Sequence, residues 1–127
     1  MEKLNEVSNR IEDLEITRAG FYTDLLSGNL KKENLLLQAQ EILFPVEIEI
    51  NANKELKNID SRKAALKEVL KNNNEYQEIL IELKKLDSEK DETDLDLRRN
   101  LIKINSQKRK FQLLKLELMI KHNIQVV

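Results

Sequence analysis

Few side chains in this sequence are suited to acid–base, thiol or metal chemistry. The 127 residues include no cysteine and one histidine, His122, which excludes a thiol nucleophile and a Cys/His zinc site. Histidine is the side chain that most readily exchanges a proton near neutral pH. However, no glutamate stands three residues before His122, as the Glu-x-x-His pairs of di-metal bundles require. We interpret His122 as an exposed histidine near a helix end.

Carboxylates are numerous and gather in residues 87–96. This segment lacks the glycine that an EF-hand calcium loop needs, so we interpret it as a solvated acidic face. The chain holds only two glycines and no glycine-rich phosphate-binding motif. The sequence therefore predicts a protein that is not an enzyme and that binds neither a cofactor nor a metal ion.

Charge is strongly segregated along the second half of the chain. The formal net charge is −1, but residues 72–97 carry 3 basic and 9 acidic side chains, and residues 98–127 carry 8 and 1. We favour pairing of the basic segment with the acidic segment of the same or another copy, because the two charges nearly balance. The alternative is contact with nucleic-acid phosphates. The candidate contact residues are Arg98, Arg99, Lys103, Lys108, Arg109, Lys110 and Lys115.

Composition and periodicity predict an all-α fold. Glycine (2), proline (1) and aromatic residues (4%) are scarce, whereas β-sandwiches need frequent turn residues. Apolar residues instead recur at alternating spacings of three and four, which is typical of a heptad seam between helices. We expect an elongated antiparallel coiled-coil hairpin or helical bundle with a long C-terminal helix. The predicted association seam consists of Leu4, Val7, Ile11, Leu14, Phe21 and Leu25, together with Leu97, Leu101, Ile104, Phe111 and Leu118.

Turn-forming residues set the predicted helix boundaries within a single domain of residues 1–127. Gly28 suits the left-handed position that follows a helix, and Pro45 disfavours helical geometry at Phe44. Asn74, with Gln77 three residues later, matches the capping-box pattern. We predict helices at about 2–27, 30–44, 46–71 and 75–121, with a C-terminal tail at 122–127.

Two segments leave alternatives open. Residues 46–50 alternate between apolar and acidic side chains, which is typical of a strand. Pro45 also suits the first turn of a helix, and we favour a helix there. Residues 87–94 contain no apolar side chain and are compatible with a hairpin tip, but the heptad spacing persists across them, so we favour one continuous helix.

The last predicted helix has more apolar residues than one seam needs. Its expected seam continues after Leu97 through Leu101, Ile104, Lys108, Phe111, Lys115 and Leu118. Further apolar side chains widen this stripe: Ile102, Leu113, Leu114, Leu116 and Ile120. A stripe of this width is expected to contact more than one neighbouring helix.

The sequence predicts a protein that acts through association. No apolar run is long enough for a signal peptide or a spanning helix, so we expect a cytoplasmic protein that does not bind membranes. A short chain with two such seams cannot bury both by itself. We therefore expect a coiled-coil adaptor or scaffold that forms a homo-oligomer, with a dimer favoured, and binds a protein partner. The alternatives are a nucleic-acid-binding accessory protein and a small phage or mobile-element inhibitor of a larger host enzyme.

Overall fold

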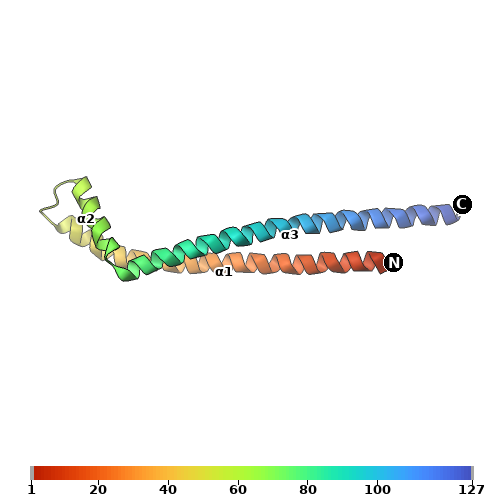
Figure 1. The fold of residues 1–127 in the computed structure, drawn as a ribbon, viewed down its shortest axis with the longest axis horizontal. Coiled ribbons are helices and arrows are strands. Elements are labelled where there is room, and N and C mark those ends of the chain that lie inside the picture. Colours follow the sequence, from red (N-terminus) through yellow and green to blue (C-terminus); the bar gives the residue numbers. More distant parts are fainter. Residues whose placement is uncertain (1, 127) are drawn as a thin grey trace. The chain divides into compact units, whose positions relative to one another are not determined.

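The computed structural model of the chain describes residues 2–126. These residues form three helices, α1 (Glu2–Ala52), α2 (Ile59–Lys71) and α3 (Asn74–Val126), and no strand (Figure 1). The prediction of an all-α fold with a long C-terminal helix is confirmed. The contacts group into two compact units. The terminal unit joins residues up to 25 with residues from 91 onward, and the central unit is residues 26–90.

In the terminal unit, α1 lies antiparallel to α3. Leu4, in the first turn of α1, shares a hollow with Leu114 and Leu118 near the end of α3. Leu14, further along α1, accepts a hydrogen bond from Asn100, which comes earlier in α3. The buried and half-buried side chains of α1 keep the predicted heptad spacing here: Leu4, Val7, Ile11, Leu14, Arg18, Phe21 and Leu25.

The side of α3 that faces α1 differs from the expected seam at alternate positions. Lys108 and Lys115, which the sequence places on the seam, are exposed, whereas Leu101 is half-buried. The residues that follow the inward spacing are all buried or half-buried: Thr93, Leu97, Asn100, Ile104, Gln107, Phe111 and Leu114. The expected seam is therefore wrong at the two lysines. The prediction preferred the apolar Leu101 to the polar Asn100, and the heptad repeat of residue 101 then falls on Lys108 and Lys115, one residue after each inward position.

Asn100 is a polar side chain buried in the terminal unit. Its Nδ2 donates a hydrogen bond to the carbonyl of Leu14 at 3.1 Å, whereas its Oδ1 is buried with no hydrogen-bond partner among the described residues. A buried acceptor without a partner costs about 1–3 kcal/mol. A single buried asparagine in a heptad seam fixes which residues of the two helices face each other, at a cost in stability.

Replacing this asparagine is expected to stabilise the chain. Asn100→Leu removes the unpartnered acceptor, which costs about 1–3 kcal/mol, and also loses the hydrogen bond to Leu14, which contributes about 0.5–1.5 kcal/mol, so we expect the free energy of unfolding to rise by about 1 kcal/mol. Urea denaturation followed by circular dichroism, at one fixed protein concentration, measures the change. Asn9→Leu, at an exposed position of α1, is the matched control and is expected to have a much smaller effect. Equal effects of the two substitutions would contradict this account.

In the central unit, α1 continues without a break through Gly28. The predicted helix end at this glycine is wrong: no described glycine has a positive φ, and a Cβ added at Gly28 would meet no atom within 4 Å. The alternating spacing of three and four residues that runs from Leu4 to Leu25 continues along the same helix. The residues at these positions are at least half-buried: Gly28, Lys32, Leu35, Ala39, Ile42 and Val46. Continued burial on one face outweighs the weak helix propensity of glycine.

Pro45 also lies inside α1, so the predicted helix boundary at Phe44 is wrong. Proline lacks the amide hydrogen that would bond to the carbonyl of Glu41, and its ring crowds that carbonyl. Pro45 is exposed, whereas Val46 is half-buried and Ile50 is buried, so packing on another side of the helix holds the turn. Residues 46–50 are helical, which confirms the preference for a helix over a strand.

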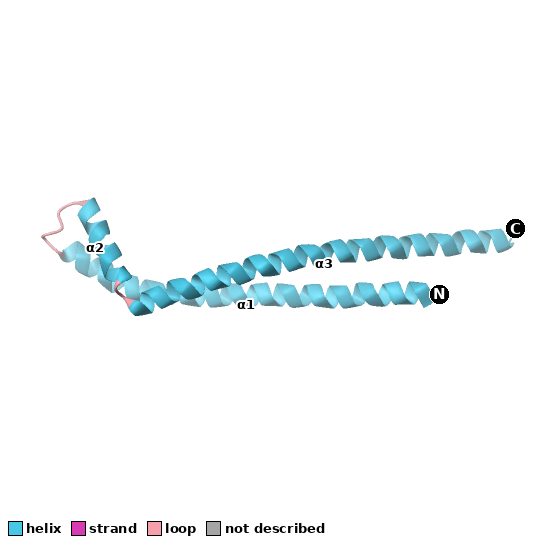
Figure 2. Cartoon of the chain, in the orientation of Figure 1, coloured by secondary structure: helices cyan, strands magenta, loops and turns pink. Residues whose placement is uncertain are grey.

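The predicted helix at 46–71 is interrupted, because α1 ends at Ala52 and α2 begins at Ile59 (Figure 2, pink). The Asn53 side chain accepts a hydrogen bond from the amide of Glu55 at 3.0 Å, which is an Asx turn. Asn58 then caps α2 by accepting from the amide of Ser61 at 2.7 Å. Two asparagines in the sequence therefore end one helix and begin the next.

The second connection is a tight turn at the asparagine triplet. Asn73, rather than the predicted Asn74, caps α3: its side chain accepts from the amide of Tyr76 at 2.9 Å. The side-chain Nε2 of Gln77 donates a hydrogen bond to the carbonyl of Leu70 at 2.9 Å, which ties α2 to α3. From there α3 is continuous through residues 87–94, as favoured from the sequence. It reaches Val126, so a tail beginning at residue 122 is wrong.

Candidate functional site

The predicted basic residues lie on α3 in the terminal unit, and all seven are exposed. Lys108 forms an ion pair across the unit, with 3.6 Å between its Nζ and Oε1 of Glu15. Arg99 lies 3.9 Å from Asp96 on the same helix. The other five form no ion pair with a described residue. Because residues 98–116 include no acidic side chain, this part of α3 carries an excess of positive charge.

The predicted association seam is used within the chain. Its α1 members, from Leu4 to Leu25, and its α3 members Leu97, Leu101, Ile104 and Phe111 are at least half-buried in the terminal unit. Leu118, the last member, is 38% exposed. The apolar side chains that remain exposed therefore lie mostly outside this seam.

Two further apolar faces are exposed. The α1 face, in the central unit, consists of Leu26, Leu30, Leu37, Phe44 and Ile48, each 59–65% exposed. The α3 face, in the terminal unit, consists of Leu95, Ile102, Leu113 and Leu116, which are 47–69% exposed. Leu30, Leu37 and Phe44 of the α1 face, and Leu95 and Ile102 of the α3 face, are spaced by seven residues, so they recur on one side of a helix.

The charged residues beside the two faces differ: those beside the α1 face are acidic, whereas those beside the α3 face include both signs. Glu33 and Glu41 lie at helical spacing beside the α1 face and are exposed. Beside the α3 face, the exposed charges change along the helix, with Asp91 and Glu92 before its middle and arginine and lysine after it. The residues on the basic side are Arg98, Arg99, Lys103, Arg109 and Lys110.

A hollow on the α3 face has the form that receives a side chain from another helix. It has a volume of about 300 Å³ and is lined by Ile102, Asn105, Ser106 and Arg109. These residues stand at positions i, i+3, i+4 and i+7, the four that surround an inserted side chain when two helices pack. The short side chain of Ser106 provides the space, and Arg109 supplies a positive charge at its edge.

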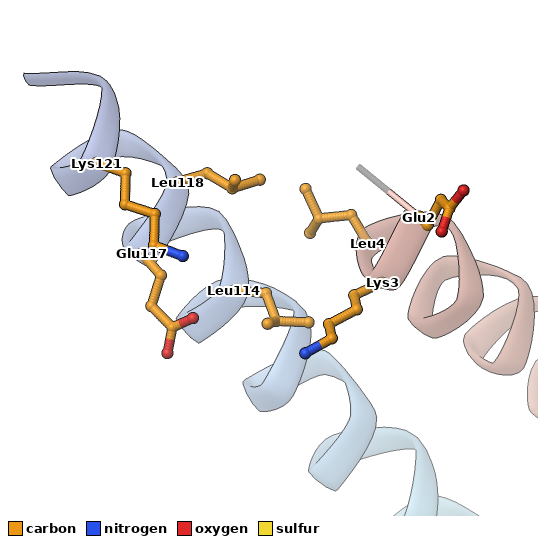
Figure 3. Close-up of a pocket in the computed structure, with 7 residues that line it drawn as sticks. All are labelled: Glu2, Lys3, Leu4, Leu114, Glu117, Leu118 and Lys121. Carbon is orange, nitrogen blue, oxygen red and sulfur yellow. The ribbon is translucent and has the colours of Figure 1, made fainter. Parts of the chain in front are cut away.

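A larger hollow, of about 500 Å³, opens between the ends of α1 and α3 in the terminal unit. In Figure 3, Leu4 of α1 points toward Leu114 and Leu118 of α3, with charged side chains around them. The charged residues that line it are Glu2, Lys3, Glu117 and Lys121. The three leucines offer an apolar contact, and the described lining residues include no serine, threonine, cysteine or histidine.

A third hollow, of about 300 Å³, lies in the central unit between α1 and α3 and is lined mostly by polar side chains. Beside it, Nζ of Lys32 lies 3.2 Å from Oδ1 of Asp87. The Lys32 side chain is 41% exposed and the Asp87 side chain 58%, so water screens this ion pair and it contributes little to stability.

The residues that the sequence suggested for chemistry do not come together. His122 is exposed, and no three His, Cys, Asp or Glu side chains of the described residues are arranged to hold a metal ion. Over residues 2–126, no helix combines the length and the hydropathy needed to cross a bilayer. Comparison with protein-family models, curated proteins and solved structures found no match to this chain.

The sequence contained a signal for both exposed faces. Leu30, Leu37 and Phe44 repeat every seven residues, as do Leu95 and Ile102. When a helix already has one heptad seam, additional apolar residues of this kind are easily interpreted as part of a single, wider apolar face. At 100° per residue, however, Ile102 lies about 200° from Ile104, on the opposite side of the helix. The angle between residues around the helix axis therefore distinguishes two separate seams from one wide seam, which the number of apolar residues does not.

Proposed function

We propose that this protein is a non-enzymatic coiled-coil adaptor or scaffold that self-associates and binds a protein partner. The imbalance between exposed and buried apolar side chains supports this function most directly. Among the described residues, 19 large apolar side chains are at least 38% exposed, and four are buried. Contiguous exposed apolar surface on a water-soluble chain marks a site of protein–protein interaction.

The total accessible surface supports the same proposal. The chain exposes 10435 Å², whereas a compact monomer of its 14.9 kDa mass exposes about 7,000 Å². The excess is roughly 3,000 Å², and a stable interface of standard size covers about 800 Å² of each partner. The surface therefore has room for both a second copy and a different protein.

The two faces suit different partners. Self-pairing of the α1 face would bring Glu33 and Glu41 near their own copies, which is unfavourable. We therefore propose that the α1 face binds a different protein, through an amphipathic helix that carries basic residues. The α3 face carries charges of both signs and suits a second copy of this chain.

Light scattering on the intact chain tests self-association. At micromolar concentration we expect a mass twice the 14.9 kDa of the chain. A monomeric mass at that concentration would contradict self-association.

Binding of a protein partner is tested by Leu30→Asp and Leu37→Asp on the exposed α1 face. Each substitution should remove binding of any protein that the wild-type chain retains, while the dimer mass stays unchanged. Retention of the same protein by both variants would rule out the α1 face as its binding site.

A nucleic-acid-binding function is the second candidate. It is favoured by the seven exposed basic side chains and by the absence of acidic residues over 98–116. If this function is correct, an electrophoretic shift of DNA or RNA at low salt should weaken steeply as salt is added. Reversing Lys108, Arg109 and Lys110 to glutamate should abolish it while helicity is retained. No shift with the wild-type chain at low salt would exclude this function.

A further inference from the structure

We propose that two copies of the chain pair antiparallel through the α3 face, with the two-fold axis passing between Arg98 and Arg99. This inference rests on the proposed self-association and specifies its surface, its direction and its register. In this arrangement Leu95 of one copy lies opposite Ile102 of the other, and the reverse pair forms on the other side of the axis. These four side chains supply the apolar contacts on either side of the axis, and all are exposed in the single chain.

The charges beside the α3 face favour this direction. Asp91 and Glu92 precede the axis along α3, and Lys103, Arg109 and Lys110 follow it. Inverting one helix brings Asp91 near Arg109 of the second copy and Glu92 near Lys103, and each contact forms twice. A parallel pair would instead set every charge beside its own copy, and like charges repel.

The hollow on the α3 face fits the same register. With Leu95 opposite Ile102, Asp91 of the second copy lies opposite Ser106, which is one of the four residues that line the hollow. The small serine leaves room for the aspartate, and the Arg109 guanidinium at the edge of the hollow can pair with its carboxylate. Shape and charge therefore select the same aspartate.

The two arginines at the axis oppose this dimer. Arg98 and Arg99 of both copies meet there, and only Arg99 has an acidic neighbour, Asp96, at 3.9 Å within its own chain. Arg98→Ala with Arg99→Ala is therefore expected to tighten the dimer severalfold. A nucleic-acid-binding face would respond in the opposite way, because the same change removes two phosphate contacts. A weaker dimer in this variant would overturn the position of the axis.

Cysteine cross-linking tests the register directly, because the natural chain has no cysteine. A disulfide needs Cα atoms about 4.4–6.8 Å apart. In the proposed dimer, Leu95→Cys alone should not cross-link, because residue 95 is offset from its own copy by seven residues, about 10 Å along the helix. The same holds for Ile102→Cys. An equimolar mixture of the two variants, and the double variant, should form a covalent dimer on oxidation.

The mass and the cross-linking pattern together distinguish a failure of the proposed register from a failure of the proposed self-association. A dimeric mass with cross-links only in the mixture and in the double variant supports the inference. A dimeric mass with cross-linking of Leu95→Cys alone indicates a parallel pair and overturns it. A dimeric mass with no cross-link overturns the α3 interface and leaves self-association standing. A monomeric mass contradicts both.

Charge exchange provides an independent measurement. Asp91→Arg and Arg109→Asp should each weaken the dimer about tenfold, because each breaks both copies of a pair. The double variant should recover most of the wild-type affinity. Lys115→Asp makes the same charge change as Arg109→Asp, away from the α3 face, and is the matched control. Failure of the double variant to recover affinity would overturn the proposed contact between these two residues.

Discussion

Ile104→Ala is expected to lower the free energy of unfolding by about 2–5 kcal/mol, because it removes buried methyl groups and leaves a cavity. Ile104 is 1% exposed and is the largest fully buried side chain among the described residues. Val7 is the other buried apolar side chain of the terminal unit. With so few buried residues, this unit has little packing with which to compensate for the loss.

Thermal and urea denaturation of wild type and variant, at one fixed protein concentration, measure this change. Ile16→Ala is the matched control: it is the same substitution in the same unit, at a residue that is 64% exposed. We expect the control to change the unfolding free energy by less than about 1 kcal/mol. Similar losses in both variants would show that burial of Ile104 does not hold α1 and α3 together.

Pro45→Ala is expected to raise the free energy of unfolding by up to about 3 kcal/mol, the difference in helix propensity between the two residues inside a helix. Alanine restores the amide that can bond to the carbonyl of Glu41 and removes the crowding ring. Pro45 is exposed, so the substitution removes no buried contact. The gain should appear in the central unit, where hydrogen exchange of the amides just after residue 45 should slow.

Gln38→Ala is the control for this substitution. Gln38 is also exposed in α1, and glutamine and alanine differ little in helix propensity, so we expect almost no change. An unchanged or lower stability of Pro45→Ala would contradict a continuous α1. It would instead indicate that proline ends a helix here, as local sequence rules suggest.

The two differences at Gly28 and Pro45 have one physical cause. Local rules treat glycine and proline as helix ends, because they consider backbone preferences alone. The spacing of Leu4 to Leu25 continues in phase through Leu35 and Ile42 to Val46, and this periodic burial keeps α1 helical. The regular spacing of apolar residues over many helical turns, which is visible in the sequence, predicts the extent of α1 better than the glycine and the proline do.

The break at residues 53–58 was also predictable in part. Asn58 stands three residues before Ser61 and two before Asp60, a pattern typical of a helix start. The apolar heptad downstream of Ala52 concealed this pattern, because Leu56 and Ile59 fit a continuing seam. Leu56 is half-buried, but Ile59 is exposed, so only part of that seam is real.

The candidate interfaces were less predictable than the fold. The segregation of charge in α3 was visible from the sequence, and it led to the expectation of association between copies. Which apolar side chains remain exposed depends on which side of each helix the chain itself covers. The helical angle separates Leu95 and Ile102 from the predicted seam residues Leu97 and Ile104, but only the packing of α1 against α3 shows that Leu95 and Ile102 stay exposed.

The terminal unit is assembled from the two most distant parts of the chain, and this sets an order of folding during synthesis. Leu14 and Asn100 are hydrogen-bonded across 86 residues, whereas the central unit is one contiguous stretch. At 5–20 residues per second, the ribosome needs roughly 3–13 s to extend the chain from residue 25 to residue 91. The first seam of α1 therefore remains without its helix partner on the nascent chain after the central unit has begun to form, and the terminal unit closes last.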